Sequence, residues 1–312
     1  MDLKQLRYFV SVLEAGGFSH AATVLGVTQP LLSRQIKLLE ERIGSELFYR
    51  NGRGVELTEA GKILKDSAIR ILNEVKGAQD QIGAMKEMPS GQYTIGVPPT
   101  VSAVLAVSLM RAVEAELPNV SFKIVDALSG HILEWLANGR LDLAVLYDAP
   151  IMTTLSVDPL LQEELVCVRP PNTSDDDAPT IISGKDLVTT PLVIPGKPHA
   201  LRLLLDRGLS DAGLPPANIK YEIDTLATIL RFVEDGMACT VLPYASVARL
   251  ERLNRVSVAL IREPKLSRRL VVATSNQRPV TKTTRRLVTI VKTQVNELVA
   301  SNVWQPKGAS DD

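Results

Sequence analysis

The chain has little of what several functional classes require. Its 35 lysines and arginines balance 35 aspartates and glutamates, so the formal net charge is zero. This balance argues against a histone-like, polybasic mode of nucleic-acid binding, although one local positive face is enough for a DNA-binding protein. With two cysteines and three scattered histidines, the sequence offers no cluster with metal-site spacing, and we expect no metal.

Targeting signals and long apolar runs are also missing. The first residues, MDLKQLRYFV, lack a basic segment followed by an apolar one, and no apolar stretch is long enough to span a bilayer. We therefore expect a cytoplasmic protein without membrane association. Cys167 and Cys239 lie in apolar, strand-like runs and are expected to be buried, reduced thiols. A length of 312 residues allows two or three compact units.

The most informative segment is SHAATVLGVTQPLLSRQIKLLEERIGSEL, residues 19–47. A short apolar helix ends at Gly26, and a longer helix follows, with Thr28 as its predicted N-cap. Two helices joined by a tight turn form a helix-turn-helix, whose second helix enters the major groove of DNA. The helical period predicts that five apolar residues form the inner face of that helix: Leu31, Leu32, Ile36, Leu39 and Ile43.

The opposite face of the second helix carries small polar and cationic groups. Its members are Gln29, Pro30, Ser33, Arg34 and Lys37. Such groups suit base edges and phosphates, so the pattern predicts a DNA-reading face. The alternative is a face that is merely solvated.

A hairpin is predicted next, in ELFYRNGRGVELT (46–58). Two alternating runs flank Asn51-Gly52, which is a strong signal for a tight hairpin turn. We interpret it as a wing with Arg50 and Arg53 at its tip, where cations reach phosphates or the minor groove. The alternative is that these turn arginines are simply solvated.

Thr58 is the predicted N-cap of a long helix at 59–88. Its apolar positions alternate in steps of four and three residues, which is the seam of a coiled coil: Leu64, Ala68, Ile71, Val75, Ala78, Ile82 and Met85. We therefore predict that this helix joins two copies into a homodimer. The alternative is an amphipathic helix packed on its own domain.

Strands alternate with helices beyond residue 92. Apolar strands at 92–99, 120–127 and 141–148 are separated by predicted helices, which is typical of a mostly parallel, helix-covered sheet. No P-loop, no Gly-x-Gly-x-x-Gly after a strand and no nucleophile elbow occurs in the sequence. We therefore predict no cofactor and no enzyme, but a regulator that binds double-stranded DNA.

Residues 9–62 resemble the N-terminal domain of the LysR-type transcriptional regulators, and the later α/β pattern extends the resemblance over nearly the whole chain. Three segments, IGVPPTVSAVL, LDLAVLYD and YEIDTLATILRFVEDGMACTVLP, are similar to the subgroup around the nitrogen-assimilation control regulator. The resemblance implies an α+β multidomain fold. Its parts are a winged helix-turn-helix (1–58), a linker and dimerisation helix (59–88), an effector-binding domain like a periplasmic binding protein (92–302) and a disordered tail (303–312).

The same resemblance implies two subdomains in the effector-binding domain, because the chain crosses between them near 161–165 and 264–268. Subdomain I is expected at 92–162 with 268–302, and subdomain II at 163–267. It also implies a homotetramer of paired dimers. A dimer predicts an interrupted palindrome as operator, and we expect the regulator to contact RNA polymerase. By the family pattern, Gln29, Pro30 and Ser33 face bases, and Arg34 meets the DNA backbone.

A small organic acid is the expected effector, in the cleft between the subdomains. Ligands of open α/β sheets bind where strands end and helices begin, which favours Thr100, Val101 and Ser102. The remaining candidates come from family analogy or from the starts of later helices: Ser129, Gly130, Pro198, His199, Arg202 and Thr225. The alternatives are ordinary helix caps, an exposed loop histidine, and an Arg202 paired with Asp206.

Two rival functions remain at this stage. One is a repressor or architectural regulator that needs no effector, which the subgroup resemblance leaves open. The other, more remote, is a solute-binding protein that shares the C-terminal fold; the missing signal peptide and the N-terminal winged helix argue against it.

Overall fold

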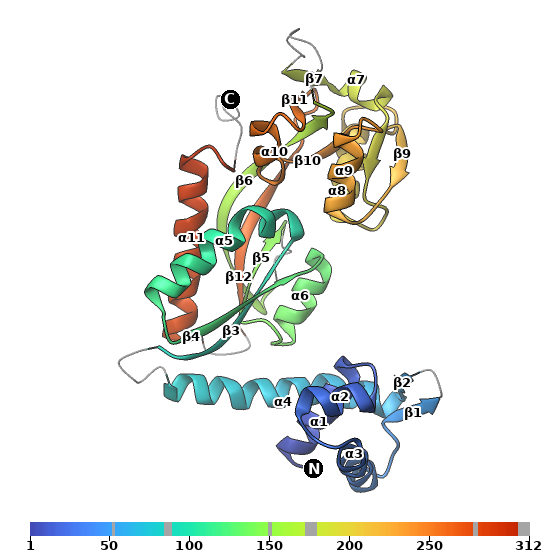
Figure 1. The fold of residues 1–312 in the computed structure, drawn as a ribbon, viewed down its shortest axis with the longest axis vertical. Helices are drawn as coiled ribbons and strands as arrows, with labels where there is room; N and C mark the ends of the chain where they lie inside the picture. The colour runs from blue at the N-terminus through green and yellow to red at the C-terminus, as the bar shows by residue number, and fades with distance from the viewer. Residues whose placement is uncertain (52–53, 84–88, 149–151, 172–179, 277–279, 305–312) are drawn as a thin grey trace.

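The computed structural model describes residues 1–51, 54–83, 89–148, 152–171, 180–276 and 280–304. Figure 1 shows a small helical head, a long helix running beside it, and a larger body of two α/β lobes. None of the described helices is long and apolar enough to cross a membrane. Both cysteines are free; Cys167 is buried as expected, whereas Cys239 is half-buried.

The head is a three-helix unit with a hairpin: α1 (Leu3–Glu14), α2 (Phe18–Leu25), α3 (Gln29–Ile43), β1 (Phe48–Asn51) and β2 (Gly54–Leu57). Phe9, Leu32 and Ile36 are completely buried in its core. The helix-turn-helix is confirmed, since α2 ends at Gly26 in the left-handed conformation (φ 64°) that glycine adopts without strain. Leu31 and Ile43, expected on the inner face, are exposed instead, because they lie at the edges of a narrower apolar stripe.

The predicted hairpin is confirmed by the antiparallel pairing of β1 with β2, from Phe48 opposite Leu57 to Asn51 opposite Gly54. Arg53 and the side chain of Arg50 lie outside the described residues.

The long helix is α4 (Glu59–Gly83). Its start is as predicted, because the Thr58 hydroxyl accepts a hydrogen bond from the Gly61 amide at 3.0 Å. Leu64 and Ala68, the first residues of the predicted seam, pack into the core of the chain's own head. Ile71 and Ile82 are exposed on this chain, so the part of the seam left for a partner begins later than the pattern predicted. Met85, its last predicted member, lies outside the described residues.

The body contains the remaining elements: β3 (Gly91–Val97), α5 (Pro99–Glu116), β4 (Val120–Asp126), α6 (Ser129–Ala137), β5 (Leu143–Tyr147), β6 (Leu155–Arg169), β7 (Ile181–Ser183), α7 (Gly184–Thr189), β8 (Leu192–Ile194), α8 (Ala200–Asp211), β9 (Ile219–Glu222), α9 (Leu226–Glu234), β10 (Thr240–Pro243), the 3-10 turn η1 (Tyr244–Ser246), α10 (Ala248–Arg252), β11 (Ser257–Arg262), β12 (Ser267–Ser275) and α11 (Lys282–Ala300). The main sheet has the strand order β4-β3-β5-β12-β6-β11-β7, and β10 also pairs with β6.

The expectation of a parallel sheet is confirmed for β3, β4 and β5, the strands on which it was based, but the sheet as a whole is mixed. Strand β3 is parallel to β4 and β5, but β12 is antiparallel to both β5 and β6. The reason is that β6 and β12 carry the chain from one lobe to the other and back, so they run in opposite directions. At the crossing the Leu165 amide donates to the Leu266 carbonyl at 2.8 Å.

The first lobe is the one that contains β3, β4, β5, α5, α6 and α11. Successive side chains of a strand point to opposite faces of the sheet, and different helices cover the two faces. Val145 and Tyr147 face a core built with α5 and α11, whereas Ala144 and Leu146 face α6. The second lobe has a separate core under α8 and α9. Helix α6 is therefore fixed to one face of the sheet, through the buried side chains of Ile132 and Leu136.

The C-terminal segment that was expected to be disordered, 303–312, begins with residues that are ordered in the structure. Trp304, which the sequence places in a disordered tail, is 1% exposed and belongs to the first-lobe core. The large apolar ring explains this, because burying it is favourable even at the end of a domain. Residues 305–312, the rest of the predicted tail, lie outside the described residues.

Gly61 is where α4 comes closest to the rest of the head, since a Cβ atom there would collide with the Leu47 carbonyl oxygen. We expect Gly61→Ala to lower the free energy of unfolding by about 2 kcal/mol, because backbone has to move. Gly77 on the same helix has open space around it and is the matched control. Gly77→Ala should raise the free energy of unfolding, measured with urea, by about 0.5–1 kcal/mol. Equal changes in the two variants would contradict the close approach of Gly61 to Leu47.

Candidate DNA-reading surface and ligand cavity

The first surface of interest is the outer face of α3. Gln29, Pro30, Arg34 and Lys37 are exposed, and Ser33 is half-buried. Helix α3 lies on the side of the head that faces away from the body (Figure 1), so no described element covers this face. The buried residues Leu32, Ile36 and Leu39 hold the helix to the head from behind. The structure thus brings the five predicted residues together on one convex, accessible surface.

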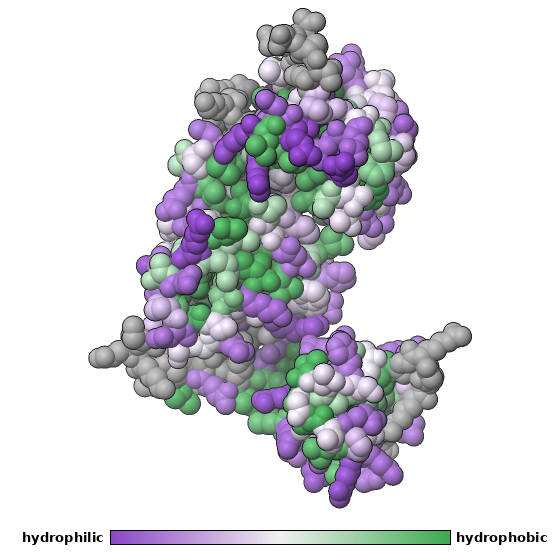
Figure 2. Space-filling model, in the orientation of Figure 1, coloured by the Kyte–Doolittle hydropathy of each residue, from purple (hydrophilic) through white to green (hydrophobic). Residues whose placement is uncertain are grey.

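The second candidate site is a cavity of about 350 Å³ between the two lobes. In Figure 2 apolar side chains reach the surface along the middle of the body, where the lobes meet. The cavity is bounded by the first residues of α5, α6, α8 and α9 and by side chains from β5, β10 and β12. Its apolar lining includes Leu128, Leu226, Ile229 and Leu242. This size and composition suit a small organic molecule.

The helix starts give this cavity a positive character. The N-cap residues of α5, α6 and α9 make no side-chain cap hydrogen bond. The first amides of α6 and α9 therefore have no side-chain partner. Helix α5 offers fewer such donors, because Pro99 has no N–H and the Val101 amide donates to the Pro98 carbonyl at 2.9 Å. Of the four helices, α8 has a side-chain cap, in which the Leu201 amide donates to His199 Nδ1 at 3.1 Å. Unpartnered amides and the positive ends of helix dipoles favour an anion.

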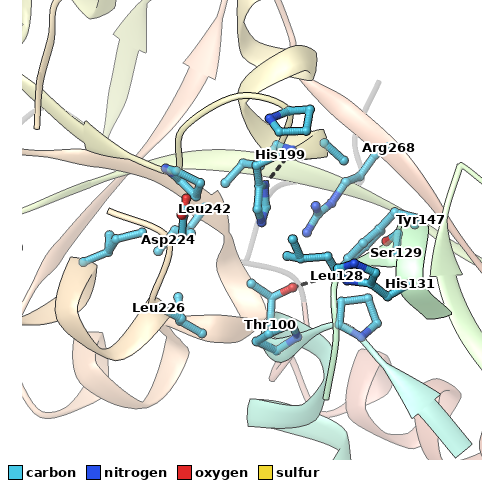
Figure 3. Close-up of a pocket in the computed structure, with 18 of the residues that line it drawn as sticks. Thr100, Leu128, Ser129, His131, Tyr147, His199, Asp224, Leu226, Leu242 and Arg268 are labelled. Carbon is cyan, nitrogen blue, oxygen red and sulfur yellow. Dashed lines mark hydrogen bonds between the residues drawn. The ribbon is translucent and has the colours of Figure 1, made fainter. Parts of the chain in front are cut away.

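Arg268 is the charged group at the centre of this arrangement. Its side chain is 6% exposed and points into the cavity toward His199 (Figure 3). It lies in register opposite Glu163 on β6, with Nε 3.4 Å from the carboxylate Oε1. Its guanidinium carbon lies 3.2 Å from the centre of the Tyr147 ring. Within the described part of the chain, its Nε and Nη2 atoms make no hydrogen bond.

Burial controls the protonation of the groups around Arg268. Burial raises the pKa of Glu163, and the nearby Arg268 charge opposes that rise. Burial also lowers the pKa of His199, and the Arg268 charge lowers that pKa further. The Tyr147 hydroxyl, whose pKa burial raises, shares a hydrogen bond with the Thr100 hydroxyl at 3.1 Å. At neutral pH the cavity therefore presents a cationic Arg268 beside a neutral His199.

The structure brings five of the nine predicted effector residues to the cavity wall: Thr100, Ser129, Gly130, Pro198 and His199. The other four are not on that wall, each for a definite reason. Val101 is completely buried in the first-lobe core, and the Ser102 amide is bonded into α5. Arg202 bonds Asp206 at 3.1 Å and Glu222 at 2.6 Å, as the alternative foresaw for Asp206.

Thr225 is the fourth residue absent from the wall. It occupies the N-cap of α9, and its neighbours Asp224 and Leu226 line the cavity instead. Sequence reasoning also missed Tyr147, His131 and, above all, Arg268. A strand reading SRRLVVATS suggests solvated arginines, and the burial of Arg268 arises from the strand crossing.

Metal chemistry has no support in the described residues, where no three His, Cys, Asp or Glu side chains group around a common point. The acidic residues that line the cavity, Glu134 and Asp224, stand on different lobes. The Asp224 carboxylate already accepts a hydrogen bond from the Gly196 amide at 3.0 Å. The cavity wall therefore combines apolar side chains with the polar groups of Thr100, His199 and Arg268.

Comparison with known proteins supplies the identity of this architecture. Residues 3–62 match the family model described as "Bacterial regulatory helix-turn-helix protein, lysR family", and residues 86–296 match "LysR substrate binding domain". The chain belongs to the LysR family of transcriptional regulators. Its members are DNA-binding regulators rather than enzymes, so the resemblance, fold class and function predicted from the sequence are confirmed at this level.

Individual relatives agree with this assignment. The chain is 32% identical over 251 residues to the nitrogen assimilation regulatory protein nac of Escherichia coli (strain K12), covering 80% of this chain and 81% of that protein. A full-length OxyR variant from Pseudomonas aeruginosa is similar in fold, with TM-score 0.71, 22% identity and 95% of both chains covered. Full-length CbnR in complex with its target DNA is similar with TM-score 0.69 and 23% identity, covering 94% of this chain and 100% of that one.

The buried Glu163–Arg268 pair gives a pH-dependent prediction. Arg268→Met leaves Glu163 buried without this partner, and we expect the free energy of unfolding at pH 8 to fall by about 3 kcal/mol. An acid whose folded-state pKa is raised contributes stability below its unfolded pKa, which is lost as pH rises through the folded value. Urea unfolding should therefore show that the stability difference between Arg268→Met and the wild type becomes smaller as the pH is lowered toward 5.

The neighbouring pair of Arg262 and Glu164, 3.0 Å apart, is the control. Glu164 also keeps Lys265 as a partner at 2.7 Å, so Arg262→Met should cost less and depend less on pH. If both variants lose stability with the same pH dependence, Glu163 is not the group responsible.

Proposed function

We propose that this LysR-type regulator binds an interrupted palindrome and that a small organic acid in the inter-lobe cavity modulates its activity. The observation that favours an acid is the Arg268 guanidinium, which lines the cavity together with the uncapped starts of α5, α6 and α9. A ligand carboxylate at the cavity side of this guanidinium would form a charge-assisted contact with it. A neutral ligand would add no charge partner to the one that Glu163 already provides.

The DNA-reading role is assigned to the outer face of α3. Gln29 can form paired hydrogen bonds to an adenine, Pro30 can contact a thymine methyl group, and Ser33 can bond either edge. Arg34 and Lys37 meet phosphates, which supply affinity without sequence information. Arg50 and Arg53 are assigned to phosphate or minor-groove contacts at the wing.

Self-association is assigned to α4 and extends to a tetramer. Ile71 and Ile82 lie on the predicted seam and are exposed on the single chain, as is Ile63 nearby on the helix. Burying such side chains between two copies is favourable. A dimer with twofold symmetry would match half-sites one helical turn, or a multiple of it, apart.

The regulatory step is assigned to a population shift between arrangements of the tetramer. A ligand changes activity by binding one arrangement more tightly, and a coupling of about 1–3 kcal/mol is typical. The cavity touches both lobes, so an acid held there would bias their relative position. The downstream effect is on the spacing of the DNA heads, on DNA bending and on contact with RNA polymerase.

Substitutions in α3 test the DNA-reading assignment. On the operator selected from a random pool by the full-length chain, Gln29→Ala should relax base preference at one position in each half-site, by about 1–3 kcal/mol. Arg34→Ala should weaken all sequences alike and flatten the dependence of affinity on salt. Equilibrium binding to single-base operator variants at several salt concentrations measures both effects.

An equal loss on every sequence for the Gln29 variant would contradict its role. Thr23→Ala on α2, at an exposed position that is not among the assigned base-reading residues, is the control and should keep the wild-type base preference.

Thermal unfolding with a panel of small carboxylic acids and their matching amides tests the cavity. At about 100 times its dissociation constant a ligand adds roughly 2.7 kcal/mol of stability. We expect one or more acids, and none of the amides, to raise the melting temperature of the wild-type chain. The shift should disappear in Arg268→Gln and persist in Arg202→Gln, whose guanidinium is already paired with Asp206 and Glu222.

Stabilisation by amides as strongly as by acids would contradict the role of Arg268. If no acid stabilises the chain, the effector-independent regulator is the better description.

A further inference from the structure

We propose that the C-terminal end of α6 is a docking surface for the DNA-binding head of the same chain, and that this contact fixes the position of the head. The surface consists of Trp135, Asn138 and Arg140 on the body. The head, taken together with α4 that packs on it, contributes Glu14 at the end of α1 and Asn73 in the middle of α4.

Two polar contacts join the head to the body. The Asn73 side-chain amide donates a hydrogen bond to the Asn138 carbonyl at 2.8 Å. Arg140 pairs with Glu14 at 3.0 Å, and its guanidinium lies 5.3 Å from the centre of the Trp135 ring. Because these contacts join residues far apart in sequence, they are tertiary contacts and no part of local helix geometry.

The chemistry of a helix end explains why these groups meet. The last carbonyls of a helix lack intrahelical partners and carry partial negative charge. Gly139 turns the chain with φ 72°, and the Trp135 carbonyl accepts from the Arg140 amide at 2.8 Å. The Asn138 carbonyl remains beyond that turn, where Asn73 satisfies it. The cationic Arg140 is favourable at the same negative end.

Apolar contact is present at this junction but incomplete. Ile69 of α4 is 6% exposed and, with Leu72 and Trp135, lines a cavity of about 340 Å³ where head and body meet. A cavity of this size means that many van der Waals contacts of a tight interface are not made. The head is therefore held mainly by a few polar contacts, and its position can change at modest cost.

The opposite end of α6 lies at the ligand cavity. Ser129, His131 and Glu134 line that cavity, whereas Trp135, the next residue, lines the head junction. Nine residues of α-helix are about 13 Å long, so one rigid unit spans both sites. That ligand binding moves α6 rests on the proposed function; the docking of the head does not.

Docking leaves the DNA-reading face free. Helix α3 lies on the far side of the head from α6, as Figure 1 shows. The contact therefore sets where each head stands relative to its body and does not block DNA. In an oligomer this fixes the distance between heads, and hence the preferred spacing of half-sites.

Charge reversal tests the docking surface without DNA or ligand. In full-length Glu14→Arg and Arg140→Glu, amides 135–141 should exchange with solvent about five-fold faster than in the wild type, because attraction becomes repulsion. The double variant restores the pair with reversed sign and should recover slow exchange. Arg207→Glu breaks an exposed ion pair with Asp211 inside α8 and is the matched control, without effect on these amides.

Mixing distinguishes the chain's own head from that of a second copy. If docking is intramolecular, co-expression of the two single variants leaves exchange fast, and only the double variant recovers. Recovery in the mixed oligomers would overturn the assignment to the same chain. Wild-type exchange in both single variants would overturn docking altogether.

Half-site spacing gives the functional readout. On operators with base pairs inserted or removed between half-sites, the single variants should lose affinity less steeply than the wild type, and the double variant should regain the steep dependence. Unchanged spacing dependence in all of them would overturn the positioning role. Such a result would leave base reading by Gln29 and acid binding at Arg268 untouched, because those tests use different residues.

Discussion

The antiparallel ladder between β6 and β12 is the constraint on which the rest of the body depends. These two strands belong to both lobes, and their register places Arg268 directly opposite Glu163 at the crossing. A buried ion pair is expensive to desolvate and is weak evidence for stability, so its presence calls for another explanation. The strand crossing places Arg268 on the wall of the cavity. The Glu163 carboxylate on the neighbouring strand reduces the cost of burying this cation.

The ends of the helices supply hydrogen-bond donors and acceptors at both candidate sites of the body. The starts of α5, α6 and α9 lack side-chain caps where they border the cavity, whereas the far end of α6 is satisfied by Asn73 of the head. The dipole of α6 thus favours an anion at one end and donors at the other. In the proposed function, an anion at the start of α6 and the head at its end contact the same short helix, which would couple the two sites.

The head could be predicted from sequence because its signals are local. A helical period, Gly26 after α2 and the Asn51-Gly52 turn each act within a few residues. The cavity was predictable in part, since Thr100, Ser129 and His199 stand where strands end or helices begin. Arg268 was not predictable, because its burial comes from two strand crossings that no local pattern encodes. The seam of α4 was misjudged at its start for a related reason: Leu64 and Ala68 already serve the head.

Regulation of this kind requires that head position be adjustable by the free energy that a small ligand can supply. A coupling of about 1–3 kcal/mol could not separate two well-packed surfaces, where each buried apolar side chain contributes about as much. It is comparable with an exposed ion pair and a hydrogen bond, which contribute about 0.2–1 and 0.5–1.5 kcal/mol. The junction at Glu14, Asn73 and Arg140, with a cavity beside it, is of the second kind. The proposed function requires a junction of this kind, because a signal carried by α6 would then need little free energy to move the head.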